Sequence, residues 1–152
     1  MVEPKRSDEL SFVKAVDRVA IAVRDLGEAR SFFENIFGAR FEPVEDIKDM
    51  KFRYQPFSVA GFKMELLCPY DSESVIARFL ENRGEGVHHI SFETEDLDEA
   101  IAELKAKGLE IAYRHRYAPE VTFEGYHWDE AFVHPKDAFG VLIHIAQKKK
   151  AQ

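Results

Sequence analysis

Apolar and polar residues alternate along two similar stretches of the chain, residues 16–23 and 86–93. Such alternation is typical of a strand with one buried face, because neighbouring side chains of a strand point to opposite sides. An aspartate follows each stretch, Asp25 and Asp96, and each has a glutamate three residues further on. This pattern predicts that a helix begins at each aspartate.

The two predicted helices end at glycines, Gly38 and Gly108, and three further strand-like stretches follow each of them. A shorter helix over residues 75–82, capped by Ser72 or Ser74, links the two halves. A shift of 71 positions superposes residues 16–19 on 87–90 and Asp25 on Asp96, and the strand 61–66 corresponds to 140–145. The order strand, helix, three strands therefore occurs twice. The further predicted strands are 41–44, 51–57, 61–67, 110–113, 131–134 and 140–145.

The repeat predicts an α+β protein made of two tandem βαβββ modules, which form a curved mixed sheet around a central cleft. We expect an N-terminal arm followed by a single domain, without a second domain or a linker. The expected boundaries are 1–13 for the arm, 14–149 for the domain, about 14–70 for module one, about 72–84 for the linking helix and about 85–149 for module two.

Composition excludes several classes of function. The 152 residues are 45% hydrophobic, enough for one compact core. A net charge of −7 argues against nucleic acid as a partner, and no apolar run approaches the roughly 18 residues of a membrane span. The polar start is unlike a signal peptide, and the single cysteine, Cys68, allows no internal disulfide. We therefore expect a soluble, cytoplasmic protein with Cys68 in its core.

The repeat pairs four polar residues on the inward faces of the predicted strands. Arg18 superposes on His89, and Glu65 superposes on His144. Two imidazoles and one carboxylate with open positions suit a divalent ion such as zinc or non-haem iron(II), which predicts a metal held by Glu65, His89 and His144. The alternative is a structural ion pair between Arg18 and Glu65, since a buried carboxylate needs a partner.

Other residues are candidates for chemistry or substrate contact. Glu93 shares a face with His89 and is a candidate base, although a solvated strand end explains it as well. His88 points to the helix side, and Lys148–Lys150 is interpreted as a solvated tail. The polar and aromatic segment 113–128 is expected to line the mouth of the cleft. The candidate substrate contacts are Arg53, Tyr126, Trp128 and Phe132.

Five motifs are similar to those of a known family. They are Asp-Arg-Val-Ala-Ile-Ala-Val at 17–23, Glu-Leu-Leu-Cys-Pro at 65–69, Gly-Val-His-His-Ile-Ser-Phe at 86–92, Phe-Val-His-Pro-Lys at 132–136 and Gly-Val-Leu-Ile at 140–143. With the duplicated βαβββ pattern, they resemble the vicinal oxygen chelate superfamily of glyoxalases, bleomycin-resistance proteins and dioxygenases. The resemblance covers about residues 16–147 and is greatest to the methylmalonyl-CoA epimerase branch.

The resemblance implies a divalent metal (Fe, Co, Ni, Mn or Zn) held by one residue from each of four strands, at Arg18, Glu65, His89 and His144. The family usually has histidine at the first of these positions and glutamate at the last. Arg18 cannot ligate, because a guanidinium stays protonated, but it offers fixed positive charge for catalysis. The epimerase's two acid/base carboxylates have no counterpart, because one position holds His144 and the strand 50–54 lacks glutamate.

The resemblance also implies a homodimer and a small-molecule substrate, and the composition adds the expectation of no nucleic acid or membrane partner. The predicted function is a metal-dependent isomerase or lyase that chelates neighbouring oxygens of a small acid or thioester. One alternative is an iron(II) dioxygenase with two histidines and one carboxylate. The other is a non-catalytic binding protein of the resistance type, in which an Arg18–Glu65 ion pair stands in place of the metal.

Overall fold

The structure is a computed structural model that describes residues 12–152. These residues form two compact units. The N-terminal unit comprises residues 18–90, and the C-terminal unit comprises residues 12–17 and 91–152. Strands β1 (Val13–Ala22) and β6 (Gly86–Thr94) each have residues in both units. The arm expected over residues 1–13 lies almost wholly outside the described residues.

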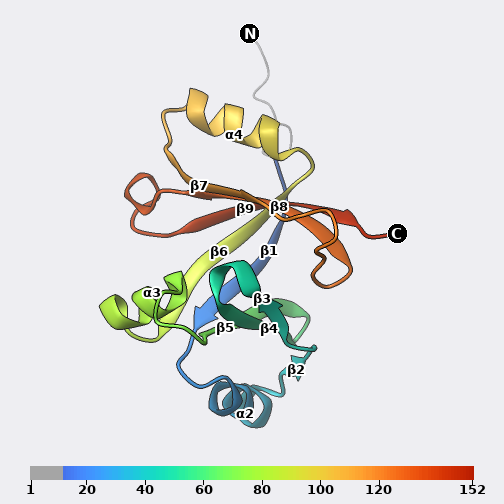
Figure 1. Ribbon diagram of the computed structural model, residues 1–152, viewed down its shortest axis with the longest axis vertical. Helices are drawn as coiled ribbons and strands as arrows, with labels where there is room; N and C mark the ends of the chain where they lie inside the picture. The colour runs from blue at the N-terminus through green and yellow to red at the C-terminus, as the bar shows by residue number, and fades with distance from the viewer. Residues whose placement is uncertain (1–11) are drawn as a thin grey trace. The chain divides into compact units, whose positions relative to one another are not determined.

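The N-terminal unit is a mixed sheet in the order β2-β4-β5-β1, packed against two helices. Strand β1 pairs with β5 in parallel, whereas β4 pairs with β5 antiparallel. The helices α2 and α3 both pack on β5 (Figure 1). The bounds in this unit are α2 Leu26–Phe37, β2 Arg40–Phe41, β3 Glu45–Ile47, η1 Lys48–Met50, β4 Phe52–Val59, β5 Phe62–Pro69 and α3 Val75–Arg83.

The C-terminal unit is a sheet in the order β6-β9-β8-β7, and helix α4 (Leu97–Ala106) lies across its strands β7, β8 and β9 (Figure 1). Leu97, Ile101 and Leu104 of α4 are buried against Ala131 and Ile145 of the sheet. This burial follows from the apolar spacing of three and four residues along the helix. The remaining bounds are β7 Ile111–Arg116, β8 Tyr126–Val133, η2 Pro135–Asp137 and β9 Ile143–Lys150.

The helix starts expected from the sequence are confirmed. The Asp25 carboxylate accepts a hydrogen bond from the Glu28 backbone N–H at 2.9 Å, and the Asp96 carboxylate accepts one from the Glu99 N–H at 3.0 Å. Helix α2 ends at Gly38, which has φ +65°, a conformation in which glycine carries no steric penalty. The α+β class and the repeated strand–helix–strands order are likewise confirmed.

Several strand boundaries differ from the prediction. The strand expected at 41–44 is divided into β2 and the unpredicted β3, both of which pair with β4. Strand β8 begins at Tyr126, five residues before the expected start at 131, because polar and aromatic side chains alternate there across two faces. Strand β9 begins at Ile143 and runs through Lys150, so the three final lysines are paired with β8 and are not a tail.

Candidate functional site

Three charged or polar side chains form a buried cluster in the N-terminal unit. Arg18 donates from Nη1 to Glu65 Oε2 at 3.2 Å, and His89 Nε2 lies 3.5 Å from Glu65 Oε1. Only 2% of Arg18, 8% of Glu65 and 7% of His89 is exposed. The register of β1 and β5, which places Ala20 beside Glu65, brings the cluster together. The predicted ion pair between Arg18 and Glu65 is therefore present.

His88 connects this cluster to helix α3. Its ring lies 4.8 Å from the ring of Phe79, as expected for a residue on the helix side of β6. Its Nδ1 also lies 2.8 Å from Nδ1 of His89, so one of the two imidazoles donates to the other. This contact orients the His89 ring with Nε2 toward Glu65.

His144 belongs to a second buried cluster, in the C-terminal unit. Its Nδ1 lies 2.7 Å from Ser91 Oγ, and its Nε2 lies 2.6 Å from Glu130 Oε2. Tyr117 donates its hydroxyl proton to the other oxygen of Glu130 at 3.1 Å. The Phe132 ring, a predicted substrate contact, packs 4.9 Å from the His144 ring.

Ser91, Tyr117 and Glu130 belong to the His144 cluster and are not among the site residues predicted from the sequence. The strand predicted from the sequence begins one residue after Glu130 and therefore leaves this carboxylate out. In the strand that the structure shows, Glu130 lies two residues from Phe132, which is directly opposite His144 on β9. Residues two apart in a strand share a face. Extending the alternation back to Tyr126 therefore places Glu130 beside His144.

Lys148 is the centre of a third cluster, also in the C-terminal unit. Its ammonium donates to Asp17 at 3.0 Å and lies 3.8 Å from Glu93. It also lies 5.3 Å from the ring centre of Tyr126 and 5.2 Å from that of Trp128. These cation–π contacts explain why a lysine near the chain end is largely buried. Glu93, the predicted base, contacts a second lysine as well, Lys14, at 3.8 Å.

Arg53 is exposed on β4, in the N-terminal unit. Its guanidinium is stacked 4.9 Å from the ring centre of Tyr70.

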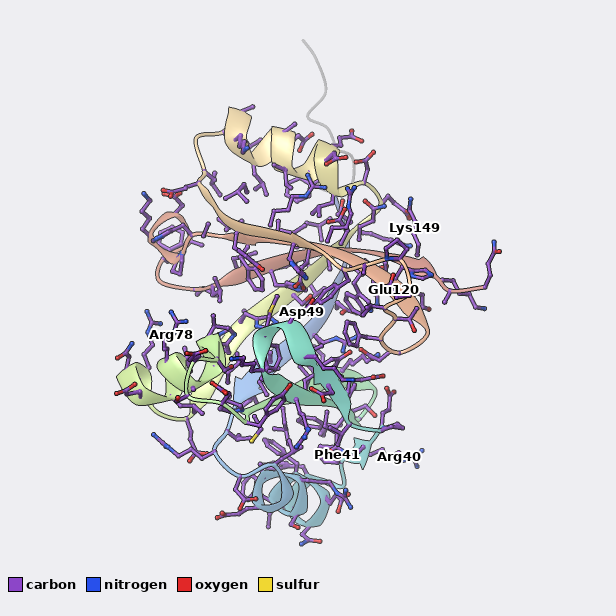
Figure 2. All side chains as sticks on the ribbon, viewed as in Figure 1. Arg40, Phe41, Asp49, Arg78, Glu120 and Lys149 are labelled. Carbon is purple, nitrogen blue, oxygen red and sulfur yellow. The ribbon has the colours of Figure 1, made fainter. Side chains whose placement is uncertain are left out.

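Figure 2 shows the described side chains, and its labels Arg40 and Phe41 mark the short strand β2. The roles of Arg53, Glu93 and the three aromatic residues of β8 in substrate binding or catalysis stay predictions.

Cys68 has the properties expected of a structural residue. Its thiol is partly buried on β5 and lies 3.5 Å from the backbone carbonyl oxygen of Arg24, to which it donates. Burial raises the pKa of the Cys68 thiol above the usual value for cysteine. Because the thiolate is the nucleophilic form, this shift disfavours a catalytic role.

The side-chain atoms that would bind a metal already have hydrogen-bond or ion-pair partners within the protein. This arrangement does not fit a resident divalent ion. Within residues 12–152, no three His, Cys, Asp or Glu side chains are grouped to hold a metal. Both oxygens of Glu65 already face Arg18 and His89, and both ring nitrogens of His144 face Ser91 and Glu130. The guanidinium of Arg18, beside Glu65, would also repel a dication.

Comparisons with known proteins agree with the fold. Residues 17–132 match the model of the Glyoxalase/Bleomycin resistance protein/Dioxygenase superfamily. The chain is 34% identical to the mitochondrial methylmalonyl-CoA epimerase of Homo sapiens, over 87% of this chain and 73% of that protein. It is 35% identical to the ethylmalonyl-CoA/methylmalonyl-CoA epimerase of Cereibacter sphaeroides, over 87% of this chain and 96% of that protein. The crystal structure of methylmalonyl-CoA epimerase from Mycobacterium tuberculosis matches with a TM-score of 0.80 and 30% sequence identity. The match covers 97% of this chain and 94% of that chain.

Proposed function

Because the chain belongs to the Glyoxalase/Bleomycin resistance protein/Dioxygenase superfamily, we propose that it is an isomerase acting on the coenzyme A thioester of a small branched dicarboxylic acid. The similarity to methylmalonyl-CoA epimerases over most of the chain supports this reaction class. Such an epimerisation removes a proton from the carbon next to the thioester carbonyl and returns a proton to the opposite face. The intermediate is an enolate with negative charge on the carbonyl oxygen.

The observation that carries the proposal is the buried Arg18–Glu65–His89 cluster. Burying charges costs free energy, and an apolar cluster of similar volume is often as stable or more stable. A guanidinium fixed in a site of low dielectric stabilises a developing oxyanion strongly, because it needs no reorganisation during the reaction. We infer that Glu65 holds Arg18 in place and that Arg18 stabilises the enolate oxygen.

Each unit contains an imidazole with a carboxylate partner, an arrangement that supports proton transfer. His89 has Glu65 as its carboxylate partner, and His144 has Glu130. A carboxylate that accepts from one ring nitrogen fixes the tautomer and the orientation of the ring. These pairs replace the two carboxylates that the epimerase resemblance implies and that the sequence lacks. Since the donors do not fit a resident metal, no step of the proposal involves one.

A non-catalytic binding protein is the second candidate. The Arg18–Glu65 ion pair, which was expected for that class, is the specific observation in its favour. The buried His144–Glu130 pair favours the enzyme, because a binding surface has no need of two carboxylate–imidazole pairs. No contact among the described residues favours the iron(II) dioxygenase.

The proposed function is tested with methylmalonyl-CoA in deuterium oxide. We expect the protein to incorporate deuterium at the carbon next to the thioester, which mass spectrometry detects. Replacing Arg18 by methionine should lower the rate about 100-fold, because the fixed cation beside the enolate oxygen is lost. Arg30→Met is the matched control, since Arg30 forms only an exposed pair with Glu34, and its rate should be unchanged.

Arg18→Met leaves Glu65 buried without its cation, so the variant can fail to fold. The double variant Arg18→Met/Glu65→Gln removes both charges and should fold, yet stay inactive. Absence of deuterium uptake by the unaltered protein, or full activity of the double variant, contradicts the proposal.

A further inference from the structure

Helix α2 of the N-terminal unit carries more apolar surface than the sheet covers. Leu26 and Phe33 of this helix pack against the core of the unit. By contrast, 52% of Phe32, 63% of Ile36 and 55% of Phe37 is exposed to solvent. No residue of α2 is buried, whereas α4 buries four apolar residues. The apolar face of α2 is therefore only partly used within its own unit.

The three exposed residues form one continuous surface, here called the α2 patch (Phe32, Ile36 and Phe37). The ring centres of Phe32 and Phe37 lie 5.9 Å apart, and both rings also contact Phe33, at 5.2 and 6.1 Å. Ile36 lies one turn after Phe32, and residues four apart are neighbours on the surface of a helix. An aromatic side chain carries about 150–250 Å² of surface, so the patch exposes roughly 300 Å².

The size and shape of the α2 patch suit the centre of a protein interface. Apolar patches of about 300–600 Å² are the largest on ordinary monomers and often have a function. A specific dimer hides about 800 Å² on each partner, and the apolar part lies in the middle, within a polar rim. Small-molecule sites are concave, whereas the exposed side of a helix is convex.

Charged side chains stand at both ends of the α2 patch. Glu28 lies four residues before Phe32, and Arg40 lies four residues after Ile36. Arg40, which is labelled in Figure 2, begins strand β2 shortly after the end of the helix. Both charged side chains are exposed, and neither forms an ion pair with another of residues 12–152. One acidic and one basic group are thus free to pair with a second molecule.

We propose that two copies of this chain meet at the α2 patch, with their α2 helices antiparallel about a two-fold axis. Such an axis places the same surface on both sides of the interface, which therefore has to be complementary to itself. An axis midway between Phe32 and Ile36 brings each Phe32 onto the partner's Ile36. It also brings each Glu28 beside the partner's Arg40, because the two charges are equally far along the sequence from that midpoint. Each helix end then lies near the partner's end of opposite partial charge.

A second copy fits the α2 patch better than other occupants do. An anionic lipid surface would repel Glu28 and a protein with a net charge of −7. An acidic or a basic protein partner would leave one of the two flanking charges without a counterion, whereas a second copy matches both. A homodimer was expected from the family resemblance, which assigned no surface to it.

The first test measures the molar mass in solution by light scattering after size-exclusion chromatography. At about 50 µM, the unaltered protein should have about twice the 17.5 kDa of one chain. Ile36→Glu should raise the dissociation constant at least about 100-fold, because the dimer would bury two carboxylates near its axis. Val75→Glu is the matched control and should stay dimeric, since Val75 is a 49% exposed residue at the start of α3.

Two results of this test overturn the proposal. One is a monomeric unaltered protein, whether or not it then binds vesicles of phosphatidylcholine or another protein. The other is a dimer that Ile36→Glu leaves intact, because the interface would then lie elsewhere. Circular dichroism checks that the variant is folded, as expected for a change at a largely exposed position.

The second test exchanges the charges that flank the patch, and it does not disturb the apolar residues. Glu28→Arg and Arg40→Glu should each raise the dissociation constant about 10-fold, because each places like charges opposite one another in both symmetric pairs. The double variant Glu28→Arg/Arg40→Glu reverses both pairs and should return to within about 3-fold of the unaltered protein. Analytical ultracentrifugation measures all three. A double variant that dimerises no better than either single variant overturns the antiparallel pairing.

Discussion

At the scale of single residues, two buried cations among residues 12–152 each have a carboxylate partner. Arg18 has Glu65, and Lys148 has Asp17 together with two aromatic rings. Each pairing satisfies a side chain whose burial alone would cost several kcal/mol. The ion pair at Arg18 was predictable, because an apolar strand contained a single carboxylate that needed a partner. The burial of Lys148 was not, because three consecutive lysines are more often a solvated surface.

The thiol of Cys68 gives a prediction that depends on pH. Burial raises its pKa, so the folded protein holds less thiolate at neutral pH than the unfolded chain does. We expect a disulfide reagent to label the folded protein more slowly than the urea-unfolded protein at pH 7.5. The ratio of the two rates should approach one as pH rises past the raised pKa. Equal rates at pH 7.5 would contradict the inferred shift.

At the scale of secondary-structure elements, the helices were more predictable than the strands. The starts of α2 and α4 are encoded locally, by an aspartate whose side chain caps the backbone three residues later. Strands β8 and β9 form by pairing with each other. Tyr126 lies opposite Lys150 at one end of the pairing, and Val133 lies opposite Ile143 at the other. The Tyr126–Lys150 end of that pairing carries no apolar run, so the sequence predicts only the apolar end of each strand, at 131–134 and 140–145.

The local encoding of α2 predicts a measurable cost for loss of its cap. Asp25→Ala should lower the free energy of unfolding by about 1 kcal/mol, because the Glu28 N–H loses its acceptor. Asp25→Ser is the matched control and should retain most of the stability, since serine also caps helices well. Urea denaturation followed by circular dichroism measures both. If Asp25→Ser lowers the free energy of unfolding as much as Asp25→Ala does, Asp25 stabilises the protein through something other than its helix cap.

At the scale of the whole molecule, family membership was predictable from five short motifs, but the chemistry of the site was not. The motifs locate Arg18, Glu65, His89 and His144, and the structure shows that each is engaged with a protein partner. The decisive partner, Glu130, lies outside the motifs. Among the helices of residues 12–152, none could span a lipid bilayer.

The central claim is that proton transfer next to a thioester carbonyl relies on Arg18 and needs no resident metal. The most direct measurement is deuterium uptake into methylmalonyl-CoA by protein treated with a chelator and shown by elemental analysis to hold no divalent metal. We predict uptake at the same rate before and after chelation, with no increase on adding cobalt, nickel, manganese, zinc or iron(II). Uptake that is absent from the stripped protein, or that appears only when one of these metals is restored, would contradict the account.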